Sequence, residues 1–181
     1  MEWPRPWYQV LWAPWRMEYI KSSVESKSGG CVFCKALEMS DEEALILYRG
    51  RRAFVIMNKY PYNTGHLMVV PFRHVASLED LGEEELLEMG LLVKASLRAL
   101  RRAYRPQGFN VGVNIGRVAG AGVEDHVHIH VVPRWSGDAN FMLITGATKV
   151  IPQDLRDTYS TLKPILEEEA SRLLGRGGTG R

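Results

Sequence analysis

The sequence of 181 residues has few of the features that mark secreted, membrane or nucleic-acid-binding proteins. It contains only two cysteines, too few for a disulfide framework, and no apolar run approaches the length of a membrane span. Its start has no basic segment followed by an apolar core, so we predict a cytoplasmic protein with no membrane partner. The formal net charge is only +2, and electrostatics alone therefore gives no reason to expect nucleic acid as a partner.

No internal repeat or low-complexity linker divides the chain, and its length and 45% hydrophobic content are enough for one domain with a sizeable core. We expect a tryptophan- and proline-rich arm over residues 1–29 and the main domain over 30–150. Residues 151–181 should form a C-terminal helix and a disordered, glycine-rich tail. Prolines resist a regular helix and tryptophans pack well on surfaces, so the arm is expected to be extended.

Apolar periodicity predicts an α+β protein with an antiparallel β-sheet, one long helix and a C-terminal helix. Over residues 81–104 the apolar residues recur at helical spacing, with acidic residues at the start and basic ones at the end, as the helix dipole favours. A second helix is expected near 154–174. The expected strands cover residues 44–50, 52–58, 65–71, 108–116 and 126–133.

Three of the five histidines occupy alternate positions in the run HVHIHVV. Successive strand residues point to opposite faces, so His126, His128 and His130 share one face while the apolar residues between them point into the core. A row of half-buried polar residues explains one histidine better than three in register. One zinc ion shared by all three is disfavoured, since about 3.3 Å per residue puts the outer Cα atoms roughly 13 Å apart. The central imidazole is left to face an open site, with its neighbours orienting it or used elsewhere.

The two cysteines, Cys31 and Cys34, form a C-x-x-C pair in the segment CVFC, which we expect to be a turn. In this chain the spacing suggests metal or redox chemistry. Two thiolates need further ligands to complete a tetrahedral zinc site, and neutral imidazoles are the usual companions. Buried free cysteines and a redox pair are the alternatives, although the βαβ context of a redox motif is missing.

The run HVHIHVV resembles the His-φ-His-φ-His-φ-φ signature of the histidine triad (HIT) superfamily of nucleotide hydrolases and transferases, in which φ is apolar. The segment NKYPYNTGHLMVVPFRH resembles that family's nucleoside-binding strand and turn. The segments LWAPWRMEYI, CVFC, GFNVGVNIG and HVVPRWSGDANF are similar to the branch that acts on diadenosine tetraphosphate. The resemblance therefore extends over most of the chain, and residues 30–150 correspond to the HIT domain.

The resemblance implies roles for single residues. His128 would attack an α-phosphorus and form a covalent nucleotidyl-histidine, which a second acceptor then cleaves. His130 would help to orient the nucleophile and the phosphate, and Asn114 would lie near the phosphate oxygens. Asn58 would accept the ribose hydroxyls, and His66 would sit behind the site.

The resemblance also implies a metal site. In zinc-bearing members, and in the related galactose-1-phosphate uridylyltransferases, the companions of Cys31 and Cys34 would be His74 and the first triad histidine, His126. We therefore expect one structural zinc ion per chain and no organic cofactor. In members without metal the first histidine only makes hydrogen bonds, so His126 is also counted with the catalytic row.

The loop before the triad departs from the family pattern. Gly120 and Gly122 would let backbone N–H groups, including that of Val123, approach phosphate oxygens. Hydrolytic members typically carry Gly-Gln-Ser/Thr here and phosphorylase-like members Gly-Gly-Ser, whereas this chain has Gly-Ala-Gly-Val, with no side-chain hydroxyl or amide. Water and inorganic phosphate both stay open as acceptors, and we favour water because it needs no dedicated pocket.

These features predict an enzyme that cleaves dinucleoside polyphosphates at the α-phosphorus. A nucleotide-binding sensor, a nucleoside phosphoramidate hydrolase and a zinc-stabilised interaction module are the alternatives. The intact histidine row favours the enzyme, because a pure binder has no need of a free imidazole. We also expect a homodimer: similar family members pair through the long helix and an edge strand, and residues 108–115 alternate apolar and polar side chains in the way that such an edge would require.

Overall fold

The computed structural model describes residues 30–138 and 151–175 of the chain. Its centre is a five-stranded, fully antiparallel sheet with the strand order β1–β2–β3–β5–β4. The predicted α+β architecture is confirmed. The strands are β1 Ile46–Arg49, β2 Ala53–Met57, β3 Leu67–Pro71, β4 Gly108–Val113 and β5 Ile129–Arg134.

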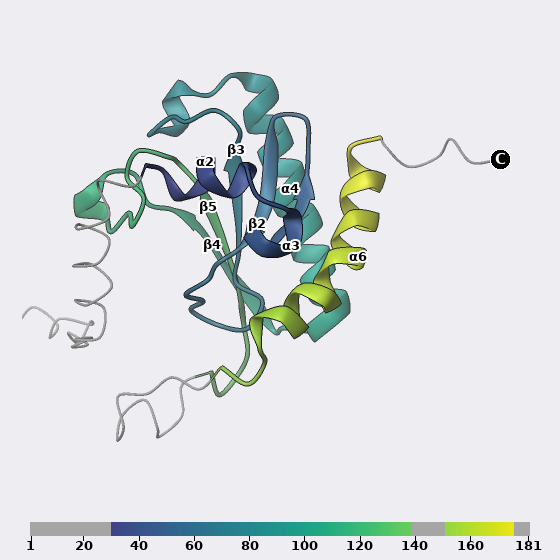
Figure 1. Cartoon of the computed structure of the whole chain (residues 1–181). Helices are drawn as coiled ribbons and strands as arrows, with labels where there is room; N and C mark the ends of the chain where they lie inside the picture. Colours follow the sequence, from purple (N-terminus) through teal and green to yellow (C-terminus); the bar gives the residue numbers. More distant parts are fainter. Residues whose placement is uncertain (1–29, 139–150, 176–181) are drawn as a thin grey trace, which may run out of the picture.

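Helices cover both faces of this sheet (Figure 1). The long helix α4, Glu83–Tyr104, and the C-terminal helix α6, Leu155–Leu173, pack together on one face. The short helix α2, Val32–Leu37, packs on the other face, where α3, Asp41–Ala44, contributes Ala44. Because both faces are covered, β2 and β3 are buried along their whole length. This double burial explains why their sequences are continuous apolar runs.

The predicted bounds of the long helix agree closely with the structure, whereas the segments before it differ from the prediction. The helix begins at Glu83, after a short 3₁₀ turn over Leu78–Asp80, and not at residue 81. The CVFC segment, expected to be a turn, instead begins the helix α2, with Cys31 as its N-cap. The expected arm over 1–29 and the end of the tail lie outside the described residues. Within the ranges that the structure describes, no helix is long and apolar enough to cross a bilayer.

The last strand is shorter than the sequence predicted, and a proline explains the difference. β3 pairs with β5 as far as Ile129; in this register Val70 would next lie opposite His128, and Pro71 opposite Val127. Proline has no N–H to donate, so Pro71 and Val127 cannot exchange the ladder hydrogen bonds that would extend the strand. The N–H of Val127 donates instead to the carbonyl of Val75, at 2.7 Å. The strand expected over 126–133 therefore starts at Ile129.

Candidate active site and metal site

The three alternating histidines lie together although only the last of them belongs to β5. The rings of His128 and His130 are 4.7 Å apart, and Phe33 of α2 contacts both His126 and His128. His126 and His128 are almost fully buried, and His130 is partly exposed. Val127 points to the opposite side, into the core beneath α4. The expectation that the histidines share one face is met, with α2 as their cover.

Hydrogen bonding defines which nitrogen of His128 carries the proton. Its Nδ1 lies 2.9 Å from the backbone carbonyl oxygen of His126. A carbonyl can only accept, so Nδ1 must donate, and in a neutral ring Nε2 is left with a lone pair. Burial lowers the pKa of His128 below its usual value. The ring is therefore neutral at pH 7, and its Nε2 can act as a nucleophile.

A second chain of hydrogen bonds assigns the opposite tautomer to His130. The backbone N–H of Tyr62 donates to Nδ1 of His66, at 3.1 Å. Neutral His66 must then carry its proton on Nε2, which lies 3.0 Å from Nδ1 of His130 and donates to it. His130 accepts at Nδ1 and consequently carries its own proton on Nε2. A lone pair on His128 and an N–H donor on His130 thus lie on adjacent rings.

His66 and His130 are both held in the neutral form. Burial, followed by the neighbouring histidine charges, lowers the pKa of His66 to about 3. Burial and the charge of His128 lower the pKa of His130 to about 4. Both values lie far below physiological pH, so the tautomer chain described above is the state present at pH 7.

These lowered pKa values make the stability of the protein depend on pH. In the unfolded chain both histidines titrate near pH 6.5, so below that pH the unfolded state binds more protons than the folded state. The stabilisation is complete above pH 6.5 and is lost as the pH falls toward 4. At pH 5 we expect a loss of roughly 2 kcal/mol from His66, and less from the more exposed His130. Thermal unfolding at pH 7 and pH 5 measures this, and His66→Gln should show the smaller difference; equal differences in the two proteins would contradict it.

The four predicted zinc ligands come together from three separate segments. The ligand atoms of Cys31, Cys34, His74 and His126 all lie within 4.8 Å of one another. Nδ1 of His126 is 3.3 Å from Sγ of Cys31, and Nδ1 of His74 is 3.5 Å from Sγ of Cys34. Two thiolates and two imidazoles form a donor set that suits tetrahedral Zn²⁺.

The protonation of this cluster also suits a metal. Nε2 of His126 lies 2.9 Å from the carbonyl oxygen of Pro71, to which it must donate. Nδ1 of His126 then presents a lone pair to the thiols, held in place by a carbonyl as metal-binding imidazoles commonly are. Burial opposes ionisation of Cys31, but the hydrogen bond that His126 donates when its Nδ1 is protonated, together with two backbone N–H groups, outweighs it and lowers the pKa of this thiol to about 6. Cys31 is therefore readily available as a thiolate.

The two asparagines expected to contact ribose and phosphate, Asn58 and Asn114, make no hydrogen bond to the triad histidines among the described residues. Asn58 follows β2, its N–H donates to the carbonyl of His66, and its side-chain oxygen accepts the N–H of Tyr60. Asn114 is two residues beyond Gly112, the strand partner of His130, and so continues the same face. Within residues 30–138, no hydrogen bond joins Asn114 to a triad histidine.

The loop before the triad begins with a 3₁₀ turn, Arg117–Ala119, which the sequence did not predict. Gly120 follows it with a φ of +89°, a conformation that favours glycine. Val123 is half-buried against the cluster that contains Phe33. In the described part of the chain, the N–H groups of Gly122 and Val123 have no hydrogen-bond acceptor. They are free to bind an anionic oxygen.

Phe33 and Tyr62 were not predicted as parts of the site. Phe33 packs against two triad histidines, and Tyr62 stacks on His66 with centroids 4.8 Å apart. The usable signals were the apolar spacing of Phe33, Ala36 and Leu37, which suits one helix face, and the position of Tyr62 four residues before His66.

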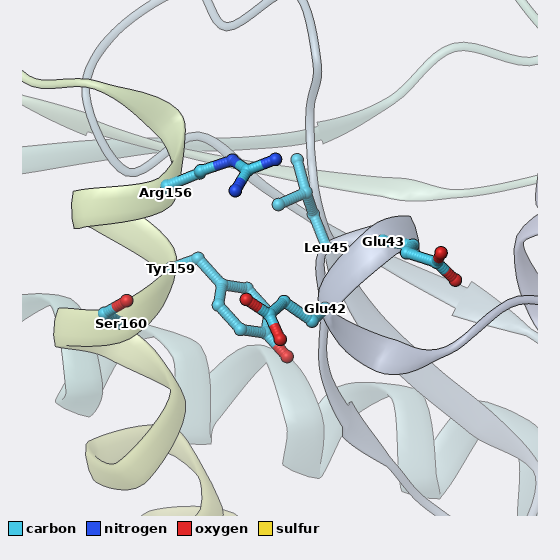
Figure 2. Close-up of a pocket in the computed structure, with 6 residues that line it drawn as sticks. All are labelled: Glu42, Glu43, Leu45, Arg156, Tyr159 and Ser160. Atoms are coloured by element: carbon cyan, nitrogen blue, oxygen red, sulfur yellow. The ribbon is translucent and has the colours of Figure 1, made fainter.

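A pocket between α3 and α6 lies apart from these residues (Figure 2). Arg156 and Tyr159 project from α6 toward Glu42 and Leu45 across it. None of the predicted site residues lines this pocket. The hydroxyl of Tyr159 donates to the carbonyl of Ile46, so this wall has a structural part in joining α6 to β1.

Gly65 is needed where it stands, directly before His66. Its φ is +76°, and a Cβ there would lie 2.8 Å from Cδ2 of the buried Leu100. We expect Gly65→Ala to lower the free energy of unfolding by about 2 to 3 kcal/mol through strain and overpacking, and to displace His66. Thermal unfolding measures it. Gly90→Ala in α4, where a Cβ meets nothing within 4 Å, is the control and should raise the stability slightly; a Gly65→Ala protein as stable as the wild type would contradict the argument.

Comparisons with known proteins agree with this geometry. A family model described as HIT domain matches residues 40–137. An AP-4-A phosphorylase of Mycobacterium tuberculosis is 46% identical over 160 residues, covering 85% of this chain and 82% of the relative. An uncharacterized HIT-like protein of Saccharolobus solfataricus is 32% identical over 112 residues, covering 62% of this chain and 79% of that protein.

Solved structures with a similar fold include another histidine triad protein. A zinc-bound histidine triad family protein from Mycobacterium smegmatis has a TM-score of 0.63 at 28% identity, covering 80% of this chain and 99% of that chain. A uridylyltransferase has a TM-score of 0.66 at 18% identity, covering 86% of this chain and 54% of that chain. At that identity the second likeness concerns the fold alone.

Proposed function

The chain belongs to the HIT family, and we propose on this basis that it is an enzyme that cleaves dinucleoside polyphosphates at an α-phosphorus. The observation that carries the proposal is the hydrogen bond from Nδ1 of His128 to the carbonyl of His126, which leaves Nε2 of a neutral, buried imidazole unprotonated. The name of the relative from Mycobacterium tuberculosis, AP-4-A phosphorylase, supports the substrate class.

In the first step, the lone pair on Nε2 of His128 attacks the α-phosphorus. A P–N bond forms, and the P–O bond to the remaining phosphate chain breaks. The Nε2–H of His130 donates a hydrogen bond to a phosphate oxygen as negative charge develops there. In this proposal the N–H groups of Gly122 and Val123 donate to the phosphate oxygens as well. The leaving group is a nucleoside polyphosphate.

The intermediate explains why the carbonyl of His126 matters. Once Nε2 of His128 is bonded to phosphorus, both ring nitrogens are substituted and the imidazole carries a positive charge. The hydrogen bond from Nδ1 to the carbonyl oxygen then becomes charge-assisted and stronger. In the second step an acceptor oxygen attacks the phosphorus, the P–N bond breaks, and the neutral ring is restored.

For the acceptor we favour inorganic phosphate over water, which reverses the expectation from the sequence. The reason is the relative's name, since a phosphorylase uses phosphate. The loop Gly120–Val123, without a side-chain hydroxyl or amide, would contact either acceptor through backbone N–H groups.

A product assay with diadenosine tetraphosphate tests both parts of the proposal. With isotopically labelled inorganic phosphate, phosphorolysis yields ATP and labelled ADP, whereas hydrolysis yields ATP and AMP. We expect labelled ADP, and its formation should saturate with phosphate concentration. AMP as the sole second product at high phosphate would establish water as the acceptor, and absence of any cleavage would refute the enzymatic function.

We further propose that Cys31, Cys34, His74 and His126 hold one zinc ion with a structural role. The four donors are all used by the metal, so no position stays open for a substrate. The ion would tie the start of α2, the segment after β3 and the triad segment together.

A two-fold homodimer is the third part of the proposal. β4 is an edge strand, and two apolar side chains at this edge, Val111 and Ile115, are 47% and 44% exposed. Among residues 30–138 and 151–175 no further strand pairs with β4, and such an edge with exposed apolar side chains favours pairing with a second copy. Light scattering should give twice the chain mass of 20.5 kDa, and Val111→Lys should shift it toward the monomer; a monomeric wild type at micromolar concentration would contradict the dimer.

A further inference from the structure

Gly112 lies within β4 although neither its backbone nor its described neighbours require a glycine. Its φ is not in the positive range, the residue is exposed, and a Cβ built on it would meet no described atom within 4 Å. Glycine inside a strand weakens the strand relative to a residue with a side chain. One reason for such a glycine is a ligand that approaches the backbone closely.

The space over Gly112 borders the N–H donor of the site. Gly112 is the strand partner of His130, and directly opposite residues of antiparallel strands point to the same face. Nδ1 of His130 is taken by His66, which immediately precedes β3. The two nitrogens of an imidazole point in divergent directions, so the Nε2–H of His130 points away from β3. β4 is the neighbour of β5 on that other side.

The other groups beside this space are also hydrogen-bond donors. Asn110 and Asn114 lie two positions before and after Gly112 and continue its face. Oδ1 of Asn110 accepts a hydrogen bond from Arg134. Among residues 30–138 and 151–175, neither Nδ2 of Asn110 nor the side-chain amide of Asn114 has a hydrogen-bond partner. Two amides and the imidazole N–H thus surround a space that suits an anion with several oxygen atoms.

The register of the strands relates this space to the nucleophile. Continued by one residue beyond Val113, it places Asn114 opposite His128. Gly112 is two residues back along the same face, roughly 7 Å from Asn114 at about 3.4 Å per residue. A phosphate next to the α-phosphate on His128 therefore fits over Gly112.

The stereochemistry of the proposed reaction gives this space two occupants in turn. Attacking and leaving groups lie in line at the phosphorus, so the phosphate chain departs on the side opposite to Nε2 of His128. In the second step the bond to Nε2 breaks, and the acceptor must approach from the side that the chain has left. The first phosphate of the departing chain and the acceptor consequently use the same place.

We propose, on the basis of the function proposed above, that Gly112 keeps open the place in which inorganic phosphate binds as the acceptor. An oxygen of this phosphate forms the new P–O bond, the P–N bond breaks, and its electron pair returns to Nε2 of His128. A side chain at position 112 would obstruct phosphate and still leave room for water, which is smaller.

The partition of products tests this assignment, because labelled ADP and AMP arise from the same intermediate and their ratio does not depend on the first step. The full chain turns over diadenosine tetraphosphate at low concentrations of labelled inorganic phosphate, at which the two acceptors compete. Gly112→Ala and Gly112→Val add a methyl and an isopropyl group. Gly108→Val is the matched control, since Gly108 lies on the same strand and face and a Cβ there also meets nothing within 4 Å.

We expect Gly112→Val to lower the ratio of ADP to AMP by at least about tenfold, Gly112→Ala to lower it less, and Gly108→Val to keep it within about twofold. The melting temperature of Gly112→Val should be at least that of the wild type, because a residue with a side chain replaces a strand glycine. An unchanged ratio would overturn the assignment, as would an equal fall in Gly108→Val. A lower melting temperature would also overturn it, by showing that the folded protein itself fills the space.

Two further readings separate this assignment from the proposals on which it rests. β4 is also the edge proposed for the dimer, so light scattering is repeated on each variant; loss of the dimer in Gly112→Val alone would assign the glycine to the subunit contact and overturn its role toward phosphate. Failure of the proposed function is seen in the wild type, as absence of product or as AMP alone at every phosphate concentration.

Discussion

Replacing His128 with alanine should lower the rate of cleavage by roughly four orders of magnitude or more, because it removes the nucleophile from a mechanism that has no other route. Affinity for the dinucleotide should stay nearly unchanged, since Nε2 forms its bond only during the reaction. The buried ring also packs against Phe33, so the folded state of the variant is checked by thermal unfolding.

A direct measurement accompanies the kinetics. Rapid mixing of wild-type protein with substrate in the absence of phosphate, followed by mass spectrometry, should reveal a chain carrying one nucleotidyl group, and His128→Ala should lack it. The matched control is His130→Ala, which removes the N–H donor and keeps the nucleophile, so it should still form the adduct, more slowly. Turnover of His128→Ala within tenfold of the wild type would refute the mechanism.

Removing the metal ligands should have the second largest effect, and on stability more than on chemistry. We expect Cys31→Ser with Cys34→Ser to abolish zinc binding and lower the melting temperature by roughly 10 °C, because a closed four-ligand site stabilises the folded state. The bound ion would also anchor His126, whose carbonyl positions His128. Catalysis should therefore fall as well, but far less than in His128→Ala.

Elemental analysis of protein purified without chelator measures the metal, and we expect about one zinc ion per chain. Val32→Ala is a suitable control because Val32 is an exposed residue of the same helix, between the two cysteines. It should retain both the metal and the melting temperature. A wild-type protein without metal would leave the two cysteines as packing residues at the start of α2.

The regular elements could be predicted because each carries its own periodic signal. β2 and β3 are apolar throughout, and α4 shows helical spacing over six turns with acidic and basic ends. The helix α2 was missed because six residues give a weak periodic signal. The C-x-x-C pair was interpreted as a metal-binding or redox motif in a turn instead. The start of β5 was missed because it depends on Pro71, a residue on another strand.

For the candidate site, too, one part could be predicted from the sequence and another could not. Its residues could be named from the motifs, and the metal cluster of Cys31, Cys34, His74 and His126 assembles as the resemblance implied. The protonation states could not be read from the sequence. They depend on partners far apart in the chain: Nδ1 of His130 meets a residue 64 positions away, and Nε2 of His126 meets a carbonyl 55 positions away.

β3 has a consequence for how this chain can change in length. His66 immediately precedes the strand, and its Nε2–H donates a hydrogen bond to His130. Pro71 ends the strand, and its carbonyl accepts a hydrogen bond from His126. The length of β3 therefore sets the distance between His66, which donates a hydrogen bond to the triad, and Pro71, whose carbonyl holds the predicted metal ligand His126. Inserting or deleting one residue would either turn the side chain of His66 to the opposite face of the sheet or point the carbonyl at the other end of β3 toward β2 instead of toward His126. The length of β3 is therefore fixed by chemistry at both of its ends, in a way that its buried apolar side chains alone would not require.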